Sequence, residues 1–180
     1  YDELIRALNI FHEEKGLNIS LRNITVSTCG LTEKIMRFAD DMPQVNLAVS
    51  LHAPSDEIRL KLMPVAKSCS MSELLSVCRK YTEKTHRRIT FEYALIEGVN
   101  DSMENAAQLA ARLRGMLCHV NLIPLNRVSE KDFRGSARKH AEKFAAVLSS
   151  KGIEVTVRRE LGSDISAACG QLRLTAESEG

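Results

Sequence analysis

Apolar positions along the chain switch repeatedly between helical and strand spacing. Helical periodicity predicts helices over residues 1–15, 32–40, 72–84, 103–114 and 134–150. Short apolar runs predict strands over residues 23–27, 44–52, 88–96, 119–123 and 153–158. The repeated order of strand, helix and strand indicates right-handed crossovers and a parallel sheet. Periodicity alone does not choose between an open doubly wound sheet and part of a closed barrel.

Local signals refine two of these elements. The run over residues 44–52 is almost continuously apolar, which is typical of a strand covered on both faces. Ser55 can cap a short helix, and Ser70 can open the helix that follows. No fixed-period repeat or linker divides the chain, so residues 1–180 are expected to form one domain.

Composition agrees with a globular domain, and charge adds little. The chain has 180 residues, of which 44% are hydrophobic and 27% charged. A net charge of +2 is too mild to indicate nucleic-acid binding by itself. Two local basic stretches, Arg87 with Arg88 and residues 127–143, could contact phosphate, but a solvated helix face is the commoner explanation for such stretches.

The cysteines indicate a reducing, cytoplasmic location. Five cysteines occur without a CxxC pair. No apolar run is long enough to span a membrane, so no membrane partner is expected. Cys78 and Cys118 belong to apolar patterns and should be buried, whereas Cys29 is harder to place. Cys169 lies among small residues after the last strand, which makes it a candidate reactive thiol.

Polar residues follow the predicted strands, where parallel α/β proteins carry their functional loops. They are Ser27, Ser50, His52, Asn100 and Asn126. Such groups suit a ribose, an amino-acid moiety or an adenine edge. The same residue types also cap helices and turns, and a histidine here is often only a satisfied hydrogen-bonding group. No other histidine or carboxylate stands at metal-ligand spacing to His52, so no metal site is expected in this chain.

Five ordered segments carry a resemblance to a known family. They are residues 24–30, 47–54, 91–93 with 99–101, 120–126 and 157–172. Together they resemble the RlmN/Cfr family of radical-SAM RNA adenine methyltransferases, and the RlmN type in particular. The segments occur in the family's order and cover nearly the whole chain.

The resemblance implies a fold and a site. The fold would be α/β, namely the later half of a partial (β/α) TIM-like barrel of the radical-SAM type with parallel strands. S-adenosylmethionine (SAM) would bind at the rim through Ser27, Ser50, Leu51, His52 and Asn126. Cys169 would be the catalytic residue, carrying the methyl group as S-methylcysteine before its transfer to adenine.

The family's cluster-binding CxxxCxxC motif is absent from this chain. The resemblance places it before residue 1, together with an RNA-binding extension, so the chain is expected to be a C-terminal fragment of the radical-SAM core. A [4Fe-4S] cluster is then expected in the intact protein and not in this fragment, which should not methylate RNA alone. The implied partners are 23S rRNA, with tRNA as a second RNA, and an electron donor for the cluster.

Three alternatives stay open. A Cfr-like enzyme would methylate carbon 8 of adenosine instead of carbon 2. A non-catalytic RNA-binding or nucleotide-binding relic would keep the barrel half without the chemistry. An unrelated phosphate-binding barrel enzyme would fit the predicted fold but not the segment over residues 157–172.

Overall fold

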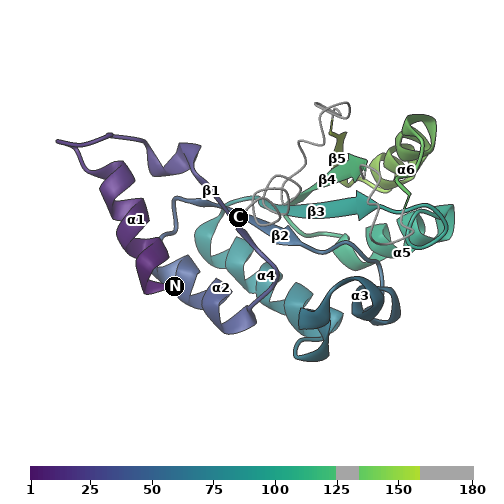
Figure 1. The fold of residues 1–180 in the computed structure, drawn as a ribbon, viewed down its shortest axis with the longest axis horizontal. Coiled ribbons are helices and arrows are strands. Elements are labelled where there is room, and N and C mark those ends of the chain that lie inside the picture. Colours follow the sequence, from purple (N-terminus) through teal and green to yellow (C-terminus); the bar gives the residue numbers. More distant parts are fainter. Residues whose placement is uncertain (125–133, 159–180) are drawn as a thin grey trace, which may run out of the picture.

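The computed structural model describes residues 1–124 and 134–158 (Figure 1). Its centre is a single sheet of five strands in the order β1-β2-β3-β4-β5. The strands are β1 Thr25–Thr28, β2 Asn46–Ser50, β3 Ile89–Leu95, β4 Cys118–Pro124 and β5 Glu154–Val157. Every neighbouring pair is parallel. The parallel sheet predicted from the alternating pattern is therefore confirmed.

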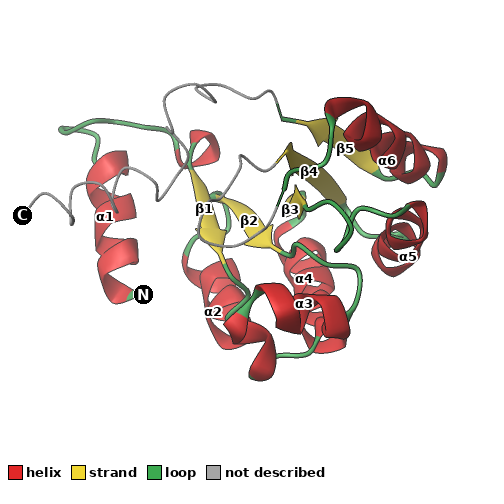
Figure 2. Cartoon of the chain, turned by 45° about the vertical axis from the view of Figure 1, so that its right-hand side comes forward, coloured by secondary structure: helices red, strands yellow, loops and turns green. Residues whose placement is uncertain are grey.

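The strand order decides which kind of parallel sheet this is. Strands that follow one another in space as in sequence all cross over in one direction, and right-handed crossovers then place every connecting helix on the same face. A doubly wound sheet would need a reversal of strand order. Figure 2 shows the helices gathered along one side of the strands. The sheet is thus a segment of barrel wall, as the expected partial barrel requires.

The helices begin close to where the pattern predicts. They are α1 Asp2–His12, α2 Thr32–Asp41, α3 Asp56–Leu62, α4 Met71–Thr85, α5 Met103–Leu113 and α6 Arg138–Ser150, with 3-10 turns at Leu21–Asn23 and Pro64–Lys67. The Ser55 hydroxyl accepts from the Ile58 amide, and the Ser70 hydroxyl accepts from the Glu73 amide, so both predicted caps are confirmed.

The start of α6 differs from the prediction. The expected helix begins at residue 134, whereas α6 begins at Arg138. The Glu97 amide donates to the Arg134 carbonyl, and Gly135 forms a bridge with Ile96. These backbone bonds to the end of β3 replace the first turn of the expected helix.

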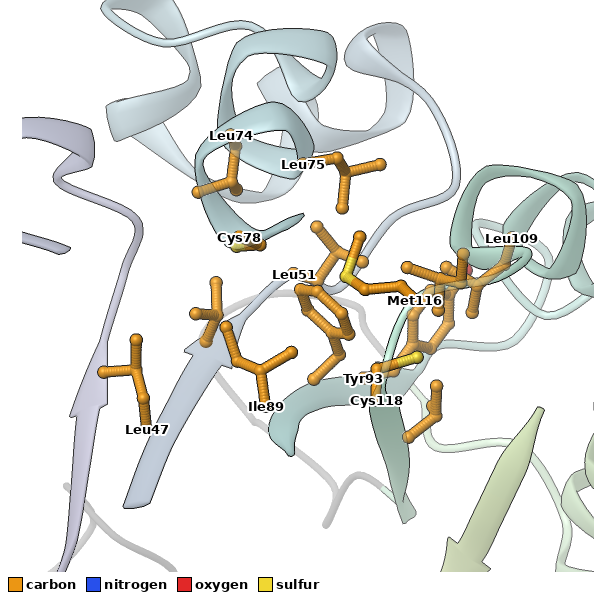
Figure 3. Packing of buried hydrophobic residues seen from close by; sticks show 14 of the residues in the cluster. Leu47, Leu51, Leu74, Leu75, Cys78, Ile89, Tyr93, Leu109, Met116 and Cys118 are labelled. Carbon is orange, nitrogen blue, oxygen red and sulfur yellow. The ribbon is translucent and has the colours of Figure 1, made fainter. Parts of the chain in front are cut away.

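The core lies between the sheet and its helices. In β3 and β4 every second residue is buried: Phe91, Tyr93, Val120 and Leu122 are 0% exposed. They belong to one core cluster, and Figure 3 shows Ile89 and Tyr93 of β3 on the same side of the sheet as Leu74, Leu75 and Cys78 of α4 and Leu109 of α5. The intervening residues of β3 and β4 are only half-buried and belong to the opposite, concave face of the sheet.

β2 is the most enclosed strand, as its continuous apolar run predicts. Leu47, Ala48 and Val49 are all buried. The strand ends at Ser50, earlier than the predicted residue 52. The cause is the backbone of His52, whose φ of 56° is left-handed and breaks the extended chain. Among the described helices, none has the length and apolar character needed to cross a bilayer.

Candidate functional site

Ser27 and Ser50 come together on the concave face. Ser27 lies on β1 opposite Ala48, and Ser50 is the last residue of β2, two positions beyond Ala48 on the same side of the strand. Ser27 is exposed and Ser50 half-buried. Neither hydroxyl takes part in a hydrogen bond between described residues. Two of the five predicted cofactor residues are therefore neighbours with hydroxyls open to a ligand.

Leu51 is placed differently from the serines. Its side chain is 0% exposed and lies in the core (Figure 3), because strand alternation turns it toward the helices. Its amide donates to the Glu92 carbonyl at 3.0 Å. Any contact of Leu51 with a ligand would therefore involve its backbone and not its side chain.

His52 stands directly after these residues with a fixed ring. The Ala94 amide donates to Nδ1 of His52 at 3.0 Å, so Nδ1 carries no proton. Burial, with a smaller effect of the Arg59 charge, lowers the pKa of His52 to about 4. The ring is neutral at pH 7 with its hydrogen on Nε2. Nε2 has no hydrogen-bond partner in the described part of the chain, so it can donate to a ligand.

The Asn100 side chain connects the ends of β2 and β3 through hydrogen bonds to their backbones, beneath this rim. Its Nδ2 donates to the His52 carbonyl at 2.8 Å and to the Ala94 carbonyl at 2.7 Å. Its Oδ1 accepts from the Ile96 amide at 2.7 Å, and the side chain is completely buried. Asn100 was one of the polar residues that follow the predicted strands as candidates to bind a ligand. Its side chain is instead used within the structure. It fixes the backbone of His52.

Arg59 of α3 supports the rim from below. The side chain is 0% exposed, and its Nη2 donates to the Cys29 carbonyl at 2.9 Å, just after β1. Nη1 donates to the Cys69 carbonyl at 3.3 Å, while Nε has no partner in the described residues. Gly30 leaves room for this arginine: its φ is 103°, and a Cβ there would lie 3.2 Å from Nη2.

A row of polar side chains crosses the concave face at the level of Ser50. Register places Ser50 beside Glu92, Glu92 beside Asn121, and Asn121 beside Thr156. Sequence reasoning missed this row as a site. The signal was the polar residue between apolar neighbours at residues 91–93 and 120–122, which marks a strand with one uncovered face.

The cysteines separate into inert and accessible thiols. Cys78 is 0% exposed and Cys118 is 7% exposed, so their predicted burial is confirmed. Burial raises the pKa of Cys78 to about 12 and that of Cys118 to about 11, which keeps both protonated. Cys69 is also buried, whereas Cys29 is exposed beside the rim.

Two predicted site residues, Asn126 and Cys169, lie outside the described residues. Their roles as cofactor contact and methyl carrier therefore stay predictions. Within residues 1–124 and 134–158, no group of three or more His, Cys, Asp or Glu side chains could hold a metal ion.

The basic residues Arg87 and Arg88 lie far along the strands from the rim. They precede β3, at the edge of the sheet where the strands begin. Arg87 Nη2 donates to Asn46 Oδ1, and Arg88 pairs with Glu154 at 2.5 Å. Both side chains thus have partners within the sheet. On α6, Arg138 pairs with Glu142 at 3.1 Å, as on an ordinary solvated helix face.

No protein-family model matches the chain. Individual proteins, by contrast, match nearly the whole chain. A protein of Clostridium perfringens named "Probable dual-specificity RNA methyltransferase RlmN" is 56% identical over 173 residues, which are 96% of this chain and 50% of that protein. A protein of Caldanaerobacter subterraneus with the same name is 54% identical over 180 residues, or 100% of this chain and 53% of its own length.

A solved structure agrees with these matches. A radical SAM methyltransferase from Sphaerobacter thermophilus superposes with a TM-score of 0.91 at 50% identity, covering 95% of this chain and 50% of that one. Over nearly its whole length the chain is thus similar in sequence to RlmN proteins and in structure to a radical SAM methyltransferase. It spans about half the length of the curated RlmN relatives that it matches.

A more distant structure supports the fold alone. A domain of a pyruvate-formate lyase-activating enzyme from Bacteroides vulgatus superposes with a TM-score of 0.66 at 16% identity and covers 88% of this chain. The arrangement of strands and helices is thus shared well beyond RlmN proteins. Similarity at this level says nothing about which substrate is bound.

Proposed function

We propose that this chain is part of a radical-SAM RNA methyltransferase of the RlmN type. The intact protein would transfer a methyl group to carbon 2 of adenosine in 23S rRNA and also in tRNA. The name of the RlmN relatives supports two RNA classes, because it describes a dual-specificity RNA methyltransferase. Because its proposed RNA substrates lie in the cytoplasm, we propose that location for the protein.

The observation that carries this proposal is an open polar rim on a parallel sheet whose sequence is similar to that of RlmN proteins. The Ser27 and Ser50 hydroxyls and His52 Nε2 lie on or next to the concave face and are unengaged among the described residues. Hydroxyls and a neutral imidazole fit the uncharged adenosine part of SAM. None of them is a strong acid or base, which agrees with a site that positions a cofactor and leaves the difficult chemistry to it.

The neutral state of His52 is useful for such a site. A protonated ring would lose the bond from the Ala94 amide to Nδ1 and would place a positive charge near the sulfonium of SAM. Burial and Arg59 keep the pKa of His52 near 4, so the ring stays uncharged at pH 7. His52 would therefore donate one hydrogen bond from Nε2 without repelling the cofactor.

The transfer itself needs a carrier thiol. Carbon 2 of adenine is electron-poor and cannot attack the methyl group of SAM, whereas a thiolate can, which breaks the sulfonium–methyl bond and releases S-adenosylhomocysteine. We assign that role to Cys169, which would hold the methyl group as a thioether close to the target adenine. Residues upstream of this chain would hold the cluster and receive electrons from a donor protein. No step through the cluster is assigned to the described residues.

Methylation of RNA by the protein expressed from its complete coding sequence tests the proposal. The protein, purified without oxygen, is incubated with SAM, a reductant and 23S rRNA or tRNA transcripts, and modified nucleosides are identified by mass spectrometry. We expect 2-methyladenosine from both RNAs, and none from Cys169→Ala. Cys29→Ala serves as the control, because Cys29 is an exposed thiol to which no chemical step is assigned. Full activity of Cys169→Ala, or methylation only at carbon 8, contradicts the proposal.

A further inference from the structure

The polar row on the concave face is held by hydrogen bonds that all run in one direction. Thr156 Oγ1 donates to Asn121 Oδ1 at 3.3 Å, and Asn121 Nδ2 donates to Glu92 Oε2 at 3.0 Å. His119 Nε2 lies 3.1 Å from Thr156 Oγ1 and donates to it, because the single hydroxyl hydrogen of Thr156 is already used. The sequence of donors ends on the Glu92 carboxylate.

Glu92 is therefore oriented by its neighbours. The amide of Asn121 can present Nδ2 to Glu92 only while its Oδ1 faces Thr156. On the same strand, Phe91 and Tyr93 are fully buried on the helix side and prevent β3 from rotating. A carboxylate on a packed strand with one oxygen already bonded has little freedom to turn, so its other oxygen points in a defined direction.

Glu92 and Ser50 are neighbours on adjacent strands, with their side chains on the same face of the sheet. Ser50 and Glu92 are paired in register on β2 and β3, and both side chains are half-buried. In the described part of the chain, neither Glu92 Oε1 nor Ser50 Oγ has a hydrogen-bond partner. A carboxylate oxygen accepts hydrogens only, and a serine hydroxyl can accept or donate. Together they suit two adjacent hydroxyl groups, as in the familiar contact between an acidic residue and a ribose.

We propose that Glu92 is a cofactor-positioning residue whose carboxylate accepts the ribose hydroxyls of the adenosyl group of SAM. Asn121 and Thr156 hold that carboxylate in place, and Ser50 completes the contact. This assignment rests on the proposed function, because it requires SAM at this rim. Hydrogen bonds to a charged acceptor change affinity by roughly 10- to 100-fold, so the loss of Glu92 should be readily measured.

The test removes each side of the contact separately. The protein from the complete coding sequence is titrated calorimetrically with S-adenosylhomocysteine and with its 2′-deoxy and 3′-deoxy analogues. We expect the unmodified protein to bind at least one deoxy analogue roughly 10-fold more weakly or worse. Glu92→Ala should bind S-adenosylhomocysteine with a similar loss and should show no further loss with that analogue. Glu92→Gln, which keeps the shape, should lie between the two.

A matched carboxylate provides the control. Glu154 is an exposed acid on β5 that pairs with Arg88 and belongs to the layer below the row. Glu154→Gln should leave the penalty for the deoxy analogues unchanged. If a Glu92 variant loses as much affinity for the deoxy analogues, relative to S-adenosylhomocysteine, as the unmodified protein does, this inference is overturned. The proposed function would then still stand. Failure of the unmodified protein to bind S-adenosylhomocysteine would instead overturn the proposed function, and this inference with it.

Discussion

Replacement of Asn100 by alanine should strongly destabilise the chain. The change removes the side chain that bonds the His52 carbonyl, the Ala94 carbonyl and the Ile96 amide at 2.7–2.8 Å. Each backbone group left buried without a partner costs about 1–3 kcal/mol, so the three together predict a loss of roughly 3–9 kcal/mol. This is a large part of the stability of an ordinary domain, which is about 5–15 kcal/mol.

Urea unfolding of the chain, followed by circular dichroism, measures this loss as a lower midpoint at unchanged slope. Asn9→Ala is the matched control, because Asn9 is exposed on α1 and should change stability by less than about 0.5 kcal/mol. A loss of less than about 1 kcal/mol for Asn100→Ala would show that water replaces the three hydrogen bonds of the Asn100 side chain, and would refute the reasoning.

Asn100→Asp tests the direction in which the stability loss changes with pH. The introduced carboxyl keeps an acceptor for the Ile96 amide but must place its second oxygen against the two carbonyls. Its charged form is disfavoured there, so its pKa in the folded chain should rise above the unfolded value of about 3.9. A raised pKa gives stability that is present below the unfolded pKa and lost as pH rises through the folded one. Relative to the unmodified chain, the variant should therefore be less destabilised at low pH than at pH 7, and an equal penalty at both would contradict this.

Three further predictions concern the rim. Gly30→Ala should destabilise by roughly 2–3 kcal/mol, because its φ is 103° and a Cβ would lie 3.0 Å from Leu74; Gly115→Ala, with φ 73° and open space, should cost only about 1 kcal/mol in the same urea assay. Because burial and Arg59 lower the pKa of His52 from 6.5 to about 4, the unfolded state gains a proton first as pH falls. Stability should drop by up to roughly 3 kcal/mol between pH 6.5 and 4, and His52→Gln should reduce that drop; equal pH profiles would contradict it. Arg59→Met leaves the Cys29 and Cys69 carbonyls without their donor and should lower thermal stability, with partial recovery in Arg59→Lys; unchanged melting of Arg59→Met would refute its supporting role.

Much of the fold follows from local signals in the sequence. Serines at 55 and 70 mark helix starts because a side-chain cap depends only on residues three positions away. Apolar runs locate the strands, and their alternation with helices predicts parallel pairing. The choice of a barrel wall over a doubly wound sheet depended on resemblance, since strand order is not a local property.

The parts that sequence reasoning missed depend on contacts between distant residues. Arg59 looks like an exposed helix residue in its own segment, and only the packing of α3 against the end of β1 buries it. The row from Glu92 to Thr156 depends on strand register, which brings together residues from three strands. His52 was identified as a site residue, but its left-handed backbone and neutral ring appear only once Ala94 and Asn100 surround it.

The proposed function requires this chain to carry the methyl group on Cys169 while its rim holds the cofactor. Trypsin cleaves after Arg159 and Arg173, so Cys169 lies in a peptide spanning residues 160–173. Mass spectrometry of that peptide, taken from protein expressed from the complete coding sequence in cells, measures the claim directly. We expect a single methyl group on the sulfur of Cys169. An unmodified Cys169 in protein that nevertheless methylates RNA would contradict it.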